Sequence, residues 1–183
     1  MVYSTPTIKS YRNLTMIKQL LLLGLLSENN MHGYRLNEYV NQAMAIYTDI
    51  KKSTIYYVLD KLEKEGYIDH EIEREGRRPE RCVYKITAKG KEYFLELLRQ
   101  HLREYTRTYY ADDIGISFMH RLPSDEVRRL LTEKRDNIRS ALKDFREQPK
   151  NDEKRRYVVS HNIAHLEADL AWIYNILMEL DTK

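Results

Sequence analysis

One stretch decides the fold of this chain, and it reads Lys51-Lys52-Ser53-Thr54-Ile55-Tyr56-Tyr57-Val58-Leu59-Asp60-Lys61-Leu62-Glu63-Lys64-Glu65-Gly66. Its apolar residues recur at the helical spacing of three and four, which predicts one buried stripe made of Ile55, Val58, Leu59 and Leu62. Ser53 or Thr54 can cap the start of this helix, and Gly66 suits a left-handed stop. The opposite face carries lysines and hydroxyl groups, which are typical of a solvated surface or of a surface that binds phosphates and base edges.

Two helices are predicted before that stretch. Residues Leu14 to Leu26 hold a leucine cluster that is apolar nearly all round, which predicts a helix buried on more than one side. After a turn, the motif Met31-His32-Gly33-Tyr34 opens a second helix with apolar residues on helical spacing. A short connector from Ala45 to Ile50 leads to the third helix.

A β-hairpin is predicted directly after the third helix. The apolar residues alternate from Tyr67 to Glu75, and they alternate again from Arg81 to Ile86. Between these strands, Gly76-Arg77-Arg78-Pro79-Glu80 is a turn signal with two arginines at its tip. Thr87 then caps a further helix. Three helices followed by a hairpin form a winged helix-turn-helix, in which one helix fits the major groove and a cationic wing follows the neighbouring backbone.

The remaining chain is predicted to be helical. The helix after Thr87 continues one apolar face to about Tyr110, and the last helix ends near Leu180. That last helix has apolar residues on nearly every face from His161 onward, which favours the core of a dimer. The fold class is therefore mostly α. We expect a leader at residues 1–13, a winged helix-turn-helix domain at 14–87, a long linking and dimerisation helix at 88–110, and a C-terminal helical dimerisation domain at 111–183.

Composition limits the class of protein. The formal net charge is +3, and the excess lies in residues 1–100, which carry 16 Lys and Arg against 13 Asp and Glu. One cysteine, Cys82, excludes an internal disulfide framework and fits a reducing cytoplasm. The most apolar run, Leu20 to Leu26, is much shorter than a membrane span of about 20 residues, so no membrane partner is expected.

Two histidine motifs invite a chemical interpretation. At His32-Gly33-Tyr34 we expect Gly33 to let the chain turn and Tyr34 to pack in the small core. His161, His165 and Asp169 follow at intervals of four on one helix face and are a weak candidate metal site, but polar core groups bonded across helices are the favoured interpretation. The chain has no Gly-rich phosphate loop, nucleophile elbow or strong metal spacing, so we expect neither an enzyme nor a cofactor.

Several short motifs stand in a fixed order along residues 14–100. They are Leu22-Leu23-Gly24-Leu25-Leu26, Met31-His32-Gly33-Tyr34, Ser53-Thr54-Ile55-Tyr56, Leu62-Glu63-Lys64-Glu65-Gly66-Tyr67-Ile68, Gly76-Arg77-Arg78-Pro79, Ile86-Thr87 and Lys89-Gly90. In this order and spacing they make the chain resemble the PadR family of bacterial transcriptional regulators. The tail from Ile114 to Leu180 resembles the longer branch of that family, whose C-terminal helical domain helps it dimerise.

The resemblance implies a cytoplasmic homodimeric repressor that binds a partly palindromic operator in double-stranded DNA. In this family the recognition helix and the wing bind DNA. The matching positions here are Lys51, Lys52, Ser53, Thr54, Tyr56, Tyr57, Lys61, Arg77 and Arg78. This chain departs from the family at Tyr57, where a proline is frequent, and the departure can change which base edges are read.

The residues themselves suggest separate roles within that set. The lysines and the two arginines are predicted to contact phosphates, and each contact would steepen the salt dependence of binding by about 0.9 in log-log slope. For any single one, the alternative is a solvated surface charge. The Tyr56 hydroxyl either donates to a phosphate or packs on the second helix.

The family resemblance also implies a small hydrophobic or phenolic effector. Four aromatic residues are candidates for its pocket: Tyr11, Tyr93, Phe94 and Tyr105. The alternative is that these rings are interface core. A second functional hypothesis is a winged-helix module that binds protein and has no effector pocket, but such a module needs neither the cationic wing tip nor the lysines before the third helix.

Overall fold

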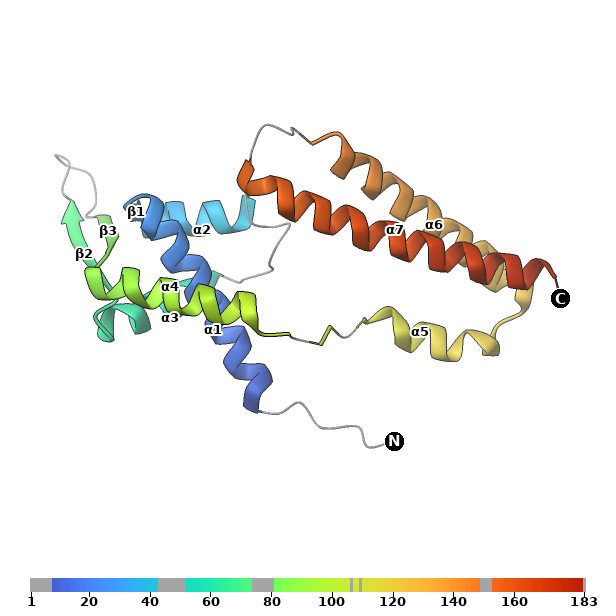
Figure 1. Cartoon of the computed structure of the whole chain (residues 1–183), viewed down its shortest axis with the longest axis horizontal. Coiled ribbons are helices and arrows are strands. Elements are labelled where there is room, and N and C mark those ends of the chain that lie inside the picture. The colour runs from blue at the N-terminus through green and yellow to red at the C-terminus, as the bar shows by residue number, and fades with distance from the viewer. Residues whose placement is uncertain are drawn as a thin grey trace. The chain divides into compact units, whose positions relative to one another are not determined.

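The computed structural model describes residues 8–42, 52–73, 81–105, 107–108, 110–148 and 153–182. The chain divides into two units, residues 1–106 and 107–183, and each is treated by itself. The N-terminal unit is a winged helix-turn-helix (Figure 1). Its elements are α1 (Ile8–Glu28), β1 (Met31–His32), α2 (Gly33–Gln42), α3 (Lys52–Lys64), β2 (Ile68–Glu73), β3 (Arg81–Ile86) and α4 (Ala88–Arg103).

A three-stranded antiparallel sheet has the strand order β1-β3-β2. The predicted hairpin is confirmed, with Ile68 opposite Ile86 at its base and Glu73 opposite Arg81 at its far end. The strand β1 was not predicted, because two residues are too few to show alternation. It pairs Met31 with Tyr84 and thereby joins the start of α2 to the wing.

The core of this unit confirms the stripe predicted on α3. Ile55, Val58, Leu59 and Leu62 are all buried. They pack with the leucine cluster of α1, with α2 and with the base of the sheet, and the main buried partners are Leu22, Leu23, Leu26, Leu36, Val40 and Ile68. Because the apolar face of α3 is fully buried in this core, the opposite face of the helix is fixed toward the outside.

The end of α3 and the start of α4 meet at one junction. Gly66 has a φ of +75°, the Gly66 N–H donates to the Glu63 carbonyl (2.8 Å), and the Tyr67 N–H donates to the Leu62 carbonyl (2.9 Å), which is the Schellman stop. The Thr87 hydroxyl donates to the Gly66 carbonyl (2.9 Å) and accepts from the Gly90 N–H (3.0 Å). Both the predicted stop at Gly66 and the predicted cap at Thr87 are confirmed.

Three boundaries differ from the predictions. The helix α1 begins at Ile8, so residues 8–13 of the expected leader are helical. The helix α3 already begins at Lys52, so Ser53 and Thr54 lie in its first turn and do not cap it. The helix α4 ends at Arg103 and does not continue to Tyr110, because the backbone of Glu104 is extended. Apolar periodicity alone gives no signal for that stop, since Tyr105 continues the pattern.

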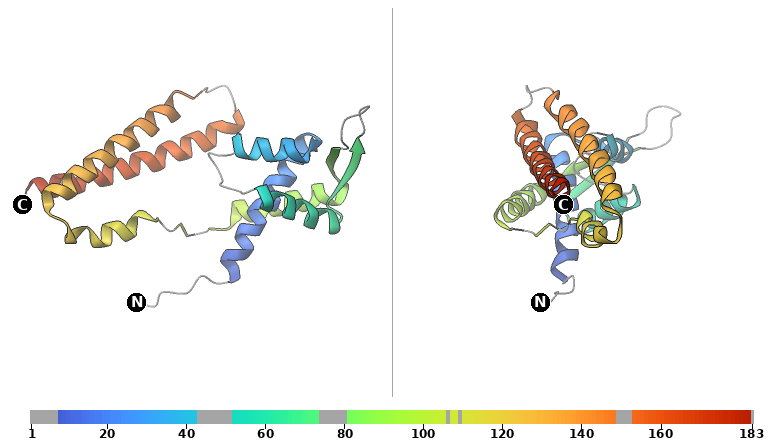
Figure 2. Two further views of the ribbon diagram at one scale, coloured as in Figure 1. Left: turned by 180° about the vertical axis from the view of Figure 1, so that it is seen from behind. Right: turned by 90° about the vertical axis from the view of Figure 1, so that its right-hand side faces the viewer.

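The C-terminal unit holds α5 (Asp112–Phe118), a 3₁₀ turn η1 (Met119–Arg121), α6 (Ser124–Arg146) and α7 (Glu153–Asp181). Both views of Figure 2 show α6 and α7 side by side. They are antiparallel, since the Arg128 guanidinium donates to the Leu180 carbonyl (2.7 Å) and Arg146 pairs with Glu167 (2.7 Å). Their buried residues are Val127, Leu142, Leu170, Ile173 and Leu177.

The helix α7 is buried on one face only in the single chain. Ile173 is 1% exposed, whereas Tyr157 is 69% and Met178 is 67% exposed. The apolar residues around this helix therefore do not all find cover within one chain. None of the described helices is long and apolar enough to cross a membrane.

Replacement of Gly90 by alanine should destabilise the N-terminal unit by about 3 kcal/mol, at the upper end of the usual cost of overpacking. A Cβ at this position would lie 1.9 Å from the Tyr67 carbonyl oxygen and 2.9 Å from the Ile86 side chain. Thermal unfolding followed by circular dichroism measures the change. Gly115→Ala is the matched control, because nothing lies within 4 Å of a Cβ there and alanine favours a helix. A midpoint for Gly90→Ala equal to that of the unmodified chain would contradict the close approach.

Candidate nucleic-acid interface

The outward face of α3 brings together most of the residues that the sequence singles out. Lys52, Ser53 and Tyr57 are exposed, and Tyr57 is the most open of the helix's aromatic residues at 66%. Lys61 is half-buried one turn further on, and Thr54 is half-buried at the edge of the core. A hydroxyl, a phenol and two ammonium groups thus share one helix surface, which suits phosphate and base-edge contacts.

The cations of this face already interact along the helix. The Lys64 ammonium donates to the Asp60 carboxylate (2.7 Å), and Lys61 pairs with Glu65 at 3.8 Å. The hydrogen bond and the charge of Asp60 raise the pKa of Lys64 above its ordinary value. The Lys52 ammonium lies 6.0 Å from the centre of the Tyr56 ring. Exposed pairs of this kind are weak, so a phosphate can replace a carboxylate partner at small cost.

Tyr56 packs against the start of α2. A Cβ placed on Gly33 would lie 3.2 Å from the Tyr56 ring and 3.1 Å from the Tyr84 ring. Gly33 is buried at the passage from β1 into α2, and its backbone is not left-handed, so the glycine allows close packing of the two rings. Burial raises the pKa of the Tyr84 phenol above its ordinary value. Tyr56 therefore orients α3 against α2 through its ring.

The expectation that Tyr34 packs in the small core is wrong. Its side chain is 46% exposed, and its ring stacks on His32 with the centroids 5.5 Å apart. The reason is that the chain passes from β1 into α2 at this point, so Tyr34 falls on the outer face of the first helical turn.

Side-chain contacts tie the described part of the wing to α3 and join its two strands. His70 on β2 bonds to Glu63 on α3, and Lys85 on β3 bonds to Glu71 on β2. Lys51 lies outside the described residues, and so do Arg77 and Arg78 of the predicted wing tip. Their assignment to DNA contact stays a prediction.

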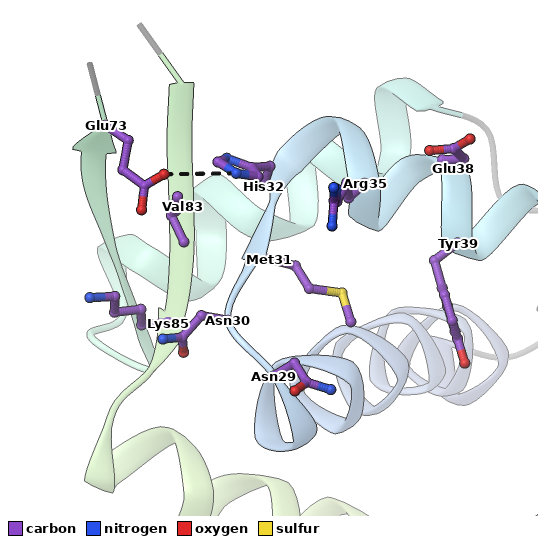
Figure 3. A pocket seen from close by; sticks show the side chains of 10 residues that line it. All are labelled: Asn29, Asn30, Met31, His32, Arg35, Glu38, Tyr39, Glu73, Val83 and Lys85. Atoms are coloured by element: carbon purple, nitrogen blue, oxygen red, sulfur yellow. Dashed lines mark ion pairs between the residues drawn. The ribbon is translucent and has the colours of Figure 1, made fainter. Parts of the chain in front are cut away.

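A hollow of about 840 Å³ lies between α2 and the wing, and sequence reasoning missed it. Figure 3 shows the ion pair between the His32 imidazole and the Glu73 carboxylate, which are 3.8 Å apart. The other ring nitrogen of His32, Nδ1, is buried and has no hydrogen-bond partner among the described residues. Arg35 and Lys85 add cationic groups to the lining. The residues that line this hollow come from four separate segments, which no local pattern brings together. The His32-Gly33-Tyr34 motif was the one local sequence signal near it.

The three described candidate effector-pocket residues are not gathered in one place. Tyr93 stacks on Tyr67 with the centroids 4.1 Å apart, and its hydroxyl donates to the Gln19 side chain at 3.3 Å. Burial raises the pKa of the Tyr93 phenol. Phe94 packs on Gly24 of α1, whereas Tyr105 lies beyond α4 and is 90% exposed. The side chain of Tyr11 lies outside the described residues.

His161 and His165 contact each other along α7. Their Nε2 atoms are 3.1 Å apart, and both side chains are exposed in the single chain. Their interpretation as polar groups bonded across the helices of a dimer stays a prediction. Asp169 lies one turn further on, in the lining of a different hollow. Across the described ranges, no group of three or more His, Cys, Asp or Glu side chains is arranged to hold a metal ion.

Comparison with known families and proteins agrees with this geometry. Residues 22–96 match the model of the Transcriptional regulator PadR-like family. The negative transcriptional regulator PadR of Bacillus subtilis is 31% identical over 80 residues, which are 44% of this chain and 44% of that protein. The aligned stretch thus spans less than half of that relative. The family whose model matches this stretch is one of transcriptional regulators.

Solved structures show the same fold over most of the chain. The crystal structure of Bacillus subtilis PadR in complex with operator DNA has a TM-score of 0.76 and 21% identity, and the match covers 90% of this chain and 99% of that one. The same protein in complex with p-coumaric acid gives a TM-score of 0.74 and 20% identity, with coverage of 89% and 98%. The fold of this chain is therefore similar to that of Bacillus subtilis PadR.

The two neighbouring tyrosines of α3 should differ sharply when each is replaced by alanine. Tyr56→Ala removes a ring that packs on Gly33 and should cost about 2 kcal/mol of unfolding free energy. Tyr57→Ala removes an exposed ring and should stay within about 0.5 kcal/mol. Urea unfolding of the two variants measures the difference. Equal losses would mean that Tyr56 does not hold α3 against α2.

Proposed function

Because residues 22–96 form a PadR-like domain, we propose that this chain is a homodimeric, sequence-specific DNA-binding repressor that a small hydrophobic or phenolic molecule releases from its operator. It acts in the cytoplasm on double-stranded DNA with a partly palindromic site, since a two-fold protein reads two related half-sites. The single observation that carries the proposal is the polar outer face of α3, where Lys52, Ser53 and Lys61 lie over a fully buried apolar stripe.

The DNA-binding role has support from the relative as well as from the site. Bacillus subtilis PadR is a negative transcriptional regulator, and its crystal structure with operator DNA has the fold of this chain. In the proposed complex, α3 lies in the major groove and reads bases through Ser53 and Tyr57. Lys51, Lys52 and Lys61, with Arg77 and Arg78 of the wing, contact phosphates.

The proposed dimer rests on apolar surface that one chain leaves open in the C-terminal unit. No residue of α5 is buried, and Ile114 and Phe118 on it are 69% and 63% exposed. These two residues are four apart, so they share one side of α5. A second copy that covers this side would remove large apolar side chains from water.

The proposed effector rests on the relative alone. Bacillus subtilis PadR has been crystallised with p-coumaric acid, a small phenolic molecule. In this chain the aromatic candidates Tyr93 and Phe94 lie in the contact between α1 and α4, where a bound ring would have to displace core packing. The effector proposal is therefore separable from the DNA-binding proposal.

A gel shift with DNA from upstream of the chain's own coding sequence tests the function. We expect a discrete complex at 50 mM salt that persists against excess unrelated DNA and weakens steeply at 200 mM salt. A protein-binding module would give no shift at either salt concentration. Retardation of own and unrelated DNA alike would contradict sequence-specific binding.

Removal of two recognition-helix lysines should weaken binding to all DNA. For Lys52→Ala with Lys61→Ala, we expect the log-log slope of affinity against salt to fall by roughly 0.9 for each phosphate that the variant no longer neutralises. Fluorescence anisotropy over a salt series measures the slope. The control is Lys91→Ala with Lys143→Ala, which makes the same change in net charge at exposed positions on α4 and α6. An unchanged slope in the first variant, or an equal decrease in both, would remove α3 from the DNA interface.

Charged residues on the open side of α5 should separate the dimer. The unmodified chain is expected to have twice its monomer mass of 22.0 kDa by light scattering. Ile114→Glu with Phe118→Glu should shift the mass to that of the monomer, because unpaired carboxylates would be buried in the interface. Tyr34→Glu with Ile72→Glu changes two exposed residues of the N-terminal unit and should leave the mass of the dimer unchanged. Dissociation by the control pair alone would place the interface elsewhere.

A further inference from the structure

A second hollow lies wholly within the C-terminal unit, among α5, α6 and α7. Its volume is about 270 Å³, near the lower end of ligand pockets, so it has room for one ring and a small substituent. The apolar part of its lining includes Ile138 of α6 and Ile173 of α7, and Ile173 belongs to the buried core of this unit. The hollow is therefore built on the packed pair of long helices.

The charge of this hollow is negative. Three carboxylates line it, from Asp112, Asp113 and Asp169, against one ammonium, from Lys134. That ammonium is already bonded to Asp112. In the described part of the chain, neither the Asp113 nor the Asp169 carboxylate has a hydrogen bond or an ion pair. Two negative charges thus face the hollow without a partner.

An aromatic ring completes the lining. Trp172 contributes the largest π face that a side chain offers to a cation, and it remains 37% exposed. Tyr110 adds a second ring at the start of this unit. An indole beside unpaired carboxylates attracts an organic cation in two ways, through its quadrupole and through charge.

We propose that the hollow around Trp172 is a binding site for a small organic cation that carries one aromatic ring, such as an aryl-substituted amine or quaternary ammonium compound. The ring would lie against Ile138 and Ile173, and the cationic nitrogen would lie between the Trp172 indole and the Asp169 carboxylate. A phenolic acid is the wrong class for this site, since its carboxylate would approach unpaired negative charges.

A metal ion fits the hollow less well than an organic cation. Divalent ions need several oxygen ligands that converge at close range, and no such convergence of carboxylates occurs among the described residues. The apolar wall at Ile138 and Ile173 would also give an ion nothing to bind. A ring with an attached charge uses both parts of the lining.

The chain has only one tryptophan, so the fluorescence of Trp172 reports on this hollow directly. The full-length protein is titrated with benzyltrimethylammonium under excitation at wavelengths that only indole absorbs. We expect a saturable change with a Kd of about 1 mM or below, which is the range of a good one-ring ligand. Phenylacetate and benzyl alcohol, as the anionic and neutral counterparts, should bind at least about tenfold more weakly. Higher salt should weaken the cation alone.

Two variants with the same chemical change sharpen the test. Asp169→Asn should weaken benzyltrimethylammonium by about three- to fivefold and leave benzyl alcohol unchanged, as expected for removal of one exposed charge partner. Asp144→Asn removes a carboxylate of α6 that does not line the hollow, and it should bind like the unmodified chain. Both positions are exposed, so both variants should fold.

Three results would overturn the proposal. They are a fluorescence that does not change up to several times the expected Kd, phenylacetate binding as tightly as the cation, and an equal effect of the two aspartate variants. The titration contains no DNA, so it is independent of the proposed repressor function. If the chain binds the cation but no operator, the proposed cation site stands and the repressor proposal fails. If the chain binds operator but no cation, only the proposed cation site fails.

Discussion

The fold of the N-terminal unit depends on one close approach between backbone groups. The Tyr67 carbonyl lies where a side chain on Gly90 would have to go, and the Thr87 hydroxyl bonds to the backbone on both sides of this contact. Three elements meet there: the end of α3, the base of the wing and the start of α4. Because backbone groups make this contact, it joins the end of α3 to the start of α4 without a long side chain.

Much of this arrangement could be predicted from local signals. The stripe on α3, the stop at Gly66 and the cap at Thr87 are encoded within a few residues, and all three are confirmed. The strand β1 and the position of Tyr34 depend on pairing with β3, which lies some fifty residues later in the chain, and no local pattern reports it. The early end of α4 escaped prediction because apolar periodicity continues through the extended segment.

In the candidate site too, features within one helix could be predicted, whereas features that join separate elements could not. Residue types on α3 could be assigned to one face because helical spacing fixes them, and the structure places Lys52, Ser53 and Tyr57 on the exposed side. The partners of the charged and titratable side chains could be anticipated only in part. The Lys64 pair with Asp60 follows helical spacing, whereas the bond between His70 and Glu63 joins different elements. The two hollows gather residues from three or more segments each, which a linear pattern does not reveal.

The short helix α5 has consequences for cooperativity. It has only seven residues, none of them buried, and a helix of that length has little stability of its own. Asp112, Asp113 and Ile116 face the hollow, whereas Ile114 and Phe118 lie on the other side. Binding on either side of α5 has to order this helix, and the free energy of ordering is spent only once. A ligand in the hollow would therefore favour association of two chains, and association would favour the ligand by the same coupling free energy. Occupancy of the hollow and association of two chains would then be linked functions, and each could be read from the concentration dependence of the other.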